Sequence, residues 1–449
     1  MIKTKKYKAS EIAKIVNGEL IGNDFSIEFI SFNSKETSKT PFLFIPLKGE
    51  RFDAENFVDE AVDNGAKIVL SSKKRKLNVS LIYVEDTKKA LYKLAEHNKG
   101  DTKIIGITGS NGKTTVKEMV LSVLSQKYKA CGTKENHNNE IGVSQTLLSI
   151  TDEDFCVVEM GMRGLGEIDF LAKLSKPYIS IVTNIGRAHI ERLKNENNIF
   201  LAKSEILKYT PKYAIVPGEK RFKKILKKTT IPVFIGRYGD LKIGKIKREN
   251  SGIKYEIIDK NLNRKYSAQI HSMYKHDLKN SLIAFSVGKI CKIDPKMILK
   301  GIFEFENLKN RGSIEKIGKF TIINDSYNSS YESLKCAILG ALELANFENK
   351  RTILVLGDML ELGDFSEKIH HKIGDFSRKM GVFNIVAMGK FSSFICKGFR
   401  GGEICNSTCE IVEYIMKNVG EKDIILIKAS RALHFEKILE GLKEKYDEN

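Results

Sequence analysis

The sequence has few cysteines and no long apolar run. Its seven cysteines are scattered along 449 residues, and Cys405 and Cys409 form one C-x₃-C pair. No second cysteine pair or His-x₃-His segment lies nearby, so we expect no zinc site, and a reducing cytoplasm fits best. No stretch approaches the ~18 apolar residues that span a membrane. The start, MIKTKKYKAS, lacks the apolar segment of a secretory signal. We therefore expect a cytoplasmic protein without a membrane span.

Acidic residues are outnumbered by basic ones. The chain has 75 Lys and Arg against 56 Asp and Glu, which gives a net charge of +19. Such an excess can mark a nucleic-acid-binding protein. However, the lysines are spread over the whole chain, and no nucleic-acid-binding motif is present. We favour a lysine-rich composition with solvated helix faces, and we expect no nucleic-acid partner.

Three regions with an alternating α/β pattern follow one another along the chain. Residues 1–98 alternate short strands and helices, and residues 311–449 repeat that rhythm. In between, residues 99–310 contain apolar β-rich runs separated by helical stretches, which is typical of a parallel sheet with crossover helices. Residues 240–270 show the polar alternation of hairpins instead. The prediction is an α/β protein of three domains: a small α/β N-terminal domain, a central P-loop ATPase domain with a mainly parallel sheet, and a C-terminal Rossmann-like α/β domain.

The segment IGITGSNGKTTVKEMV, residues 105–120, reads as a buried strand, a glycine-rich turn and a helix. Its spacing is not the strict P-loop pattern, because Ile107 stands where that pattern has its first glycine. A turn at a helix N-terminus attracts anions through its free N–H groups and the helix dipole. The alternative is a turn that binds nothing. We predict a nucleoside triphosphate site, with Lys113 reaching the terminal phosphates and Thr114 offering a hydroxyl to Mg²⁺. The predicted cradle residues are Gly109, Ser110, Asn111, Gly112, Lys113, Thr114 and Thr115.

Two candidate metal ligands follow apolar strands of the central region. Glu159 ends the run CVVEM, at the strand end where parallel sheets bind their ligands. One or two carboxylates usually hold Mg²⁺ together with phosphate oxygens, although a solvated glutamate explains the same position. His189 follows another strand end, and a structural histidine is its alternative.

Lys203 lies on an apolar helical stripe. It shares one face of a predicted helix with Ile199, Ile206 and Leu207. A lysine there must extend to solvent, pair with an acid or change chemically, and the spacing leaves these alternatives open. Burial would lower the pKa of its amine and make it reactive.

Other polar segments interrupt the apolar pattern. The run ENHNNEIGVSQTLL (135–148) suits ligand orientation or a helix cap. NDSYNSS (324–330) offers Asp325 for ribose hydroxyls and Tyr327 for stacking, or an Asx turn. GDMLELG (357–363) and KASR (428–431) follow apolar strands, and Arg431 is a candidate anion ligand or a surface ion-pair residue.

Taken together, these motifs resemble the Mur ligase family, the ATP-dependent amide ligases of peptidoglycan synthesis. The resemblance covers nearly the whole chain. The ligase core is matched by TGSNGKTT (108–115), EMG (159–161), TNIGRAHIE (183–191) and AKSE (202–205). LFIPLKGERFD (43–53), NHNNEIGV (136–143), EMGMRGLGEI (159–168), LVLGDMLELGDFSEKIH (354–370) and KASR followed by HFEKIL (434–439) are similar to the members that add a dipeptide.

The resemblance implies an activity and a set of partners. The activity is ATP-dependent ligation of D-alanyl-D-alanine to a UDP-linked muramoyl tripeptide through an acyl phosphate. The substrates are therefore small molecules, and we expect a monomer. Ligases of the same core that add a single amino acid, or glutamate to folate, are the nearest alternative.

The resemblance also implies roles residue by residue. Thr114 and Glu159 would hold one Mg²⁺, and Glu159, His189 and Lys203 a second, with Lys203 carbamylated. Lys113, Lys203 and His189 would be the catalytic residues. The nucleotide would contact His276, Asn280, Arg311, Asp325, Tyr327 and Asn328, and the UDP-muramoyl substrate would contact Ser34, Lys48, Gly49, Asn138 and Asn139, with Arg431 as a further substrate residue.

Some positions depart from the family pattern. Lys35 stands where arginine is common, Asp277 replaces the asparagine that usually follows the histidine at 276, and Asn310 precedes Arg311 where glycine is usual. None of them belongs to the predicted phosphate or metal set.

Overall fold

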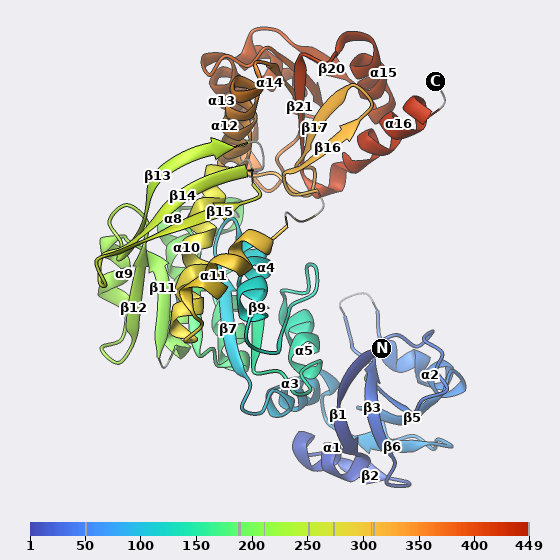
Figure 1. The fold of residues 1–449 in the computed structure, drawn as a ribbon. Helices are drawn as coiled ribbons and strands as arrows, with labels where there is room; N and C mark the ends of the chain where they lie inside the picture. The colour runs from blue at the N-terminus through green and yellow to red at the C-terminus, as the bar shows by residue number, and fades with distance from the viewer. Residues whose placement is uncertain are drawn as a thin grey trace.

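The computed structural model describes residues 1–49, 52–186, 190–210, 212–249, 252–272, 274–306, 308 and 310–447. Within these ranges the chain forms three β-sheets that follow one another in sequence, each with helices packed on it (Figure 1). The N-terminal and C-terminal parts lie at opposite ends of the molecule, with the largest sheet between them. This confirms the predicted α/β class. None of the described helices is both long enough and apolar enough to cross a membrane.

The N-terminal sheet has the strand order β1-β3-β4-β5-β6-β2. Its central strands β4 and β5 are almost wholly buried, as expected for parallel strands covered on both faces. Helix α3 follows the last strand of this sheet and packs against α5 of the central domain. The elements are β1 (Ile2–Lys8), α1 (Ala9–Val16), β2 (Glu19–Ile21), β3 (Ser26–Ser31), β4 (Phe42–Phe44), the 3₁₀ helix η1 (Ala54–Phe57), α2 (Val58–Asp63), β5 (Ala66–Ser71), β6 (Ser80–Tyr83) and α3 (Thr87–Asn98).

The central sheet has the order β15-β14-β13-β12-β11-β10-β7-β9-β8. Its strands are parallel from β8 to β13, and β13, β14 and β15 form the antiparallel hairpins that the polar alternation predicted. Helices α10 and α11 pack against α4. The elements are β7 (Lys103–Thr108), α4 (Lys113–Leu124), β8 (Ala130–Gly132), α5 (Glu140–Leu148), β9 (Phe155–Glu159), α6 (Glu167–Ser175), β10 (Ile179–Val182), α7 (Ile190–Leu193), α8 (Glu196–Ser204), η2 (Glu205–Tyr209), β11 (Tyr213–Pro217), α9 (Lys220–Ile225), β12 (Ile231–Ile235), β13 (Leu241–Glu249), β14 (Gly252–Asp259), β15 (Arg264–Ile270), α10 (Lys275–Ile290) and α11 (Pro295–Glu304).

The C-terminal sheet has the order β16-β17-β21-β18-β19-β20, with β16 antiparallel and the remaining pairs parallel. The buried run of β21 lies between β17 and β18, so the carboxyl ends of all three strands meet at one edge. The elements are β16 (Ser313–Ile317), β17 (Phe320–Asn324), α12 (Tyr331–Glu348), β18 (Arg351–Gly357), η3 (Gly363–Phe365), α13 (Ser366–Lys379), β19 (Asn384–Met388), α14 (Ser392–Phe399), β20 (Glu403–Cys405), α15 (Thr408–Asn418), β21 (Asp423–Lys428), η4 (Arg431–Leu433) and α16 (Glu436–Asp447).

Asn98 joins the N-terminal domain to the central one. Its side chain is fully buried, and its Oδ1 accepts hydrogen bonds from Thr4 Oγ1 at 3.0 Å and Tyr7 hydroxyl at 2.9 Å. Its Nδ2 lies 2.9–3.0 Å from the carbonyl oxygens of Leu147, Leu148 and Ile150, at the end of α5. One amide therefore ties β1 to α5.

The C-terminal domain touches the central domain beside the glycine-rich turn. Ser330, the N-cap of α12, donates to Asn111 Oδ1 at 3.0 Å. Farther along α12, Glu343 is within 2.6 Å of Lys275 Nζ and 3.4 Å of Arg248. These contacts fix how the two domains face each other across the site.

Candidate active site

A cleft of about 1390 Å³ lies between the central and C-terminal domains. It collects the carboxyl ends of β7, β9 and β10 from one side and those of β17, β18 and β21 from the other. The structure brings most of the predicted site residues to this cleft: Ser110, Asn111, Gly112, Lys113, Thr114, Thr115, Asn138, Asn139, Glu159, Lys203, His276, Asn280, Arg311, Asp325, Tyr327, Asn328 and Arg431.

Five predicted residues are not among the cleft residues. One of them is Gly109, which precedes Ser110 in the glycine-rich turn. Ser34, Lys48 and Gly49 belong to loops of the N-terminal domain, where the Ser34 carbonyl accepts from Asn64 Nδ2 and the Gly49 N–H donates to the Phe52 carbonyl. His189 lies outside the described residues.

The glycine-rich turn depends on two glycines. Gly109 has a φ of +151°, and a Cβ there would meet Thr183 Oγ1 at 1.9 Å. Gly112 caps α4 with a φ of +78°, in the left-handed region that side chains rarely adopt. The turn thus presents backbone N–H groups at the start of α4, where a helix favours an anion. A phosphate group fits this cradle.

Lys113 and Lys203 reach the same carbonyl. Lys113 Nζ donates to Gly109 O at 3.0 Å, and Lys203 Nζ donates to it at 3.1 Å. Burial lowers the pKa of Lys113, with Arg311 acting in the same direction and Glu159 opposing it. Burial, and then the charge of Lys113, holds the pKa of Lys203 well below its ordinary value. The spacing left it open whether Lys203 extends to solvent, and the structure buries its side chain, with an exposed fraction of 1%.

Glu159 is a buried carboxylate rather than a solvated strand end, with an exposed fraction of 3%. Its two oxygens accept from Thr114 Oγ1 at 2.8 Å and from Asn138 Nδ2 at 3.0 Å. Its backbone N–H donates to Thr133 Oγ1 at 3.0 Å. The carboxylate and the threonine hydroxyl are oxygen donors of the kind Mg²⁺ prefers, so the pair fits a magnesium site completed by phosphate oxygens. Among the described residues, no group of three His, Cys, Asp or Glu side chains surrounds a single point.

The start of α10 forms one wall of the cleft. His276 stacks on Tyr274, with ring centroids 4.9 Å apart and an interplanar angle of 22°. Asp277 accepts from Asn280 Nδ2 at 2.8 Å and from Ser272 Oγ at 2.6 Å, and its Oδ1 lies 3.6 Å from His276 Nε2. The unusual Asp277 therefore orients Asn280 and lies beside His276, the two residues predicted to contact the adenine.

The C-terminal domain contributes a second wall. The Arg311 guanidinium stacks on the Tyr327 ring at 3.7 Å, and the Tyr327 hydroxyl donates to Asn136 Oδ1 of the central domain. Lys428 Nζ lies 2.7 Å from Asp325 Oδ2 and also donates to the Asn328 carbonyl at 2.8 Å. Three separated segments of the C-terminal domain form this wall, and the docking of the domains adds Asn136 to it.

Two predicted ligand residues make the helix-cap or ion-pair contact that was the alternative to a ligand role. The Asn139 side chain caps α5 by accepting from Gly142 N–H at 2.9 Å. Arg431 forms an ion pair with Glu436 at 3.2 Å and stays about half exposed. Both still line the cleft.

Sequence reasoning missed several supporting residues. Lys117 is 1% exposed, and its amine donates to the Thr133 carbonyl, behind Glu159. Ser330, Lys428 and Tyr274 were not assigned individual roles. The available signal for Lys117 was its spacing, since it lies one helical turn after Lys113 on α4.

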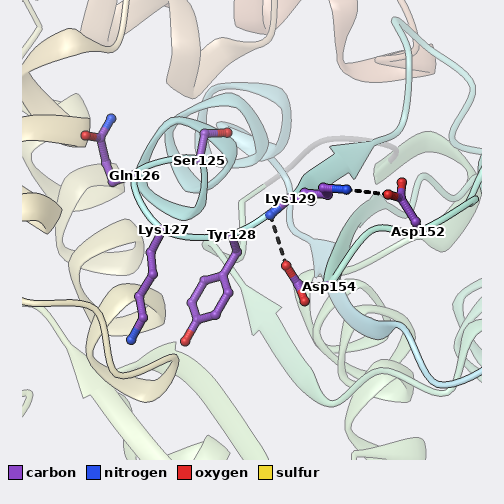
Figure 2. Close-up of a pocket in the computed structure, with 7 residues that line it drawn as sticks. All are labelled: Ser125, Gln126, Lys127, Tyr128, Lys129, Asp152 and Asp154. Carbon is purple, nitrogen blue, oxygen red and sulfur yellow. Dashed lines mark hydrogen bonds and ion pairs between the residues drawn. The ribbon is translucent and has the colours of Figure 1, made fainter.

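A second hollow lies at the other end of the central sheet (Figure 2). It is lined by Ser125, Gln126, Lys127, Tyr128, Lys129, Asp152 and Asp154. Lys129 pairs with Asp152 through its side chain, and its N–H donates to Asp154 Oδ2 at 3.0 Å. β9 begins beside this hollow and ends at Glu159, which lines the cleft. The hollow and the cleft therefore lie at opposite ends of this strand, and none of the predicted site residues lines the hollow.

Comparison with known proteins identifies the family of this chain. The sequence pattern of the Mur ligase middle domain matches residues 107–288, and that of the Mur ligase, glutamate ligase domain matches residues 311–431. The UDP-N-acetylmuramoyl-tripeptide--D-alanyl-D-alanine ligase of Bacillus subtilis (strain 168) is 33% identical, over 98% of this chain and 99% of its own. The Escherichia coli (strain K12) protein of the same name is 28% identical over 97% of this chain and 98% of its own.

A solved structure shows a matching three-dimensional arrangement. A crystal structure of MurF from Acinetobacter baumannii superposes with a TM-score of 0.90 at 27% identity, covering 99% of this chain and 100% of that one. Its coverage extends over all three sheets. On these grounds, and with the cradle and cleft described above, the chain belongs to the Mur ligase family.

Proposed function

We propose that this protein is an ATP-dependent ligase that joins D-alanyl-D-alanine to UDP-N-acetylmuramoyl-tripeptide. Full-length relatives at 33% and 28% identity carry this activity in their names. One observation carries the proposal to this chain: the Lys113 cradle of the central domain and the Arg311–Tyr327 pair of the C-terminal domain line the same cleft. ATP bound between them would have its phosphates at the cradle and its base toward α10.

The terminal carboxylate of the tripeptide takes the γ-phosphoryl group and becomes an acyl phosphate. The amine of the dipeptide attacks the acyl carbon, an amide bond forms and inorganic phosphate leaves. Lys113 neutralises charge on the transferred group, and the domains orient three substrates and exclude water.

The metal assignments are part of the proposal. Thr114 and Glu159 hold one Mg²⁺, and Glu159, His189 and a carbamylated Lys203 hold a second. When bound, these ions offset the negative charge of the phosphates. The low pKa of Lys203 supports carbamylation, because the reaction with CO₂ needs a neutral amine.

The substrate residues complete the proposal. Ser34, Lys48 and Gly49 contact the uridine diphosphate, Asn138 and Asn139 the muramoyl peptide, and Arg431 a substrate carboxylate. The domain boundaries 1–98, 99–310 and 311–449, a cytoplasmic location and a monomeric state belong to the same proposal.

The test is ADP release by the purified chain with ATP, Mg²⁺, UDP-N-acetylmuramoyl-tripeptide and D-alanyl-D-alanine, with each omitted in turn. We expect release only with the complete set, together with a pentapeptide product seen by mass spectrometry. A panel of single amino acids and folate substrates is the control. Turnover with a single amino acid instead of the dipeptide would assign the chain to another branch of the family.

The intermediate has its own test. Hydroxylamine added with ATP and the UDP-tripeptide, but without dipeptide, should trap a hydroxamate. Its absence under conditions where ligation proceeds would contradict an acyl phosphate.

A further inference from the structure

A short loop after β18 forms part of the C-terminal wall of the cleft. Leu360, Glu361 and Leu362 line the cleft next to Ser430 and Arg431. Leu360 is 45% exposed, so its side chain is available to a ligand. Glu361 has a φ of +63°, which is uncommon for a residue with a side chain and persists only where the surroundings fix it.

Three different elements fix the residues that lead into this loop. The Asp358 carboxylate accepts from the N–H groups of Lys390 and Phe391, at 2.8 and 3.0 Å. The Leu360 N–H donates to Ser430 Oγ at 2.9 Å. Between them, the Met359 N–H donates to Nε2 of His370 at 2.9 Å.

His370 is held in one protonation state by its partners. Its side chain is fully buried on α13. A backbone N–H only donates, so Nε2 must be the unprotonated nitrogen, and Nδ1 carries the hydrogen that it donates to the Ser366 carbonyl at 2.7 Å. The ring also stacks on Phe391, with centroids 4.9 Å apart and an angle of 27°. The imidazole is thus a rigid acceptor aimed at the loop.

The position of the loop suggests which substrate it meets. Asp325 and Tyr327 follow β17, whereas the loop follows β18, and β21 lies between these two strands. The nucleotide assigned to Asp325 and Tyr327 therefore lies on the β17 side. The β18 side of the cleft, beside Arg431, therefore remains for the substrate whose amine attacks.

We propose that His370 is a positioning residue that holds the loop Leu360–Leu362 in the shape that receives D-alanyl-D-alanine. This inference rests on the proposed function. His370 does not touch the substrate; it acts through the Met359 N–H, so its loss should affect the dipeptide and leave the nucleotide largely unaffected.

The experiment compares His370→Asn with His370→Gln in the full-length protein. The oxygen of a glutamine side chain extends about as far from the backbone as Nε2 and can accept from Met359, whereas that of asparagine stops near the position of Nδ1. We expect His370→Asn to raise the KM for D-alanyl-D-alanine about tenfold or more, with the KM for ATP changed less than about twofold. His370→Gln should restore the dipeptide KM to within about threefold of the unchanged protein.

His371→Gln is the matched control, because His371 is the next residue of α13 and is exposed. If His370→Asn does not fold, Ser430→Ala removes the neighbouring bond to Leu360 and should raise the same KM. An unchanged dipeptide KM in folded His370→Asn or Ser430→Ala would overturn the inference, as would equal losses for all three substrates. Failure of the proposed function is distinguishable, because the unchanged protein would then show no dipeptide-dependent ADP release.

Discussion

Lys113 and Lys203 donate to the same acceptor, the Gly109 carbonyl oxygen, although 90 positions separate them in the chain. Two ammonium groups beside one another in a buried site repel, which is one reason why the pKa of Lys203 lies well below its ordinary value. Burial, the largest cause, and this repulsion both favour a neutral Lys203 amine, which the proposed carbamylation requires.

The proposed carbamylation of Lys203 can be tested directly. In buffer containing ¹³C-bicarbonate, we expect a carbamate signal in the ¹³C spectrum that is missing from Lys203→Ala. That variant should lose most of its activity, and acetate should restore part of it by filling the space of the carbamate. Lys208→Ala is the control, because Lys208 is exposed and paired with Asp169. Identical spectra of the unchanged protein and Lys203→Ala would rule the modification out.

Replacing Lys113 by alanine should remove the positive charge at the cradle. We expect ADP release to fall on the order of 10³-fold, with little change in thermal stability. Lys129→Ala, in the hollow at the other end of the sheet (Figure 2), should keep full activity. Near-normal turnover of folded Lys113→Ala would contradict the role of this amine.

Glu159→Gln separates charge from shape. The amide keeps the size of the carboxylate, but it is a poorer ligand for Mg²⁺. We expect the Mg²⁺ concentration for half-maximal activity to rise about tenfold or more. Asn138→Ala should give a smaller change in the same direction, because it frees one Glu159 oxygen that the amide now orients. Glu413→Gln, an exposed residue on α15, is the control. Unchanged Mg²⁺ dependence in Glu159→Gln would show that the metal is held elsewhere.

Asn98 should matter for stability rather than for chemistry. Asn98→Ala leaves three carbonyls of the α5 terminus and the hydroxyls of Thr4 and Tyr7 without this buried partner. We expect the free energy of the first unfolding transition, measured in denaturant, to fall by about 2–4 kcal/mol. Thr4→Val removes a single donor and should cost about 1 kcal/mol. Equal stability of Asn98→Ala and the unchanged protein would show that the interface between the two domains does not depend on this amide.

Protonation of His370 should weaken the C-terminal domain at low pH. Burial lowers the pKa of His370 below the ordinary value of 6.5, against the opposing effects of its hydrogen bond to the Ser366 carbonyl and of the charge of Asp358. The unfolded chain then binds a proton at higher pH than the folded one, so stability is full above about pH 6.5 and declines as the pH falls toward the folded value. Melting temperatures measured from pH 7.5 to 5 should fall less for His370→Gln. Parallel curves would mean that another group controls this decline.

The order of elements around the phosphate cradle could be predicted from the sequence. The segment 105–120 predicted a strand, a glycine-rich turn and a helix, which the structure shows as the end of β7, the cradle and α4. The end of CVVEM placed Glu159 at a strand end, and the helical period placed Lys203 on the apolar stripe of its helix. These features depend on local periodicity, which a single segment contains by itself. The predicted helix through Leu207 was wrong only in detail, because α8 ends at Ser204 and the chain continues as the 3₁₀ helix η2.

The partners of these residues depended on the tertiary structure. The spacing around Asn138 and Asn139 did not decide between a ligand role and a helix-cap role. In the structure, Asn138 donates to Glu159, and Asn139 caps α5. Likewise, no local pattern pairs Ser330 with Asn111, or Tyr327 with Asn136, across about 200 positions. Periodicity determines which face of a segment is buried, whereas a hydrogen bond between domains depends on how two finished surfaces dock. The sequence therefore determined the elements and the chemistry they offer, and only the docking of the domains decided which groups meet.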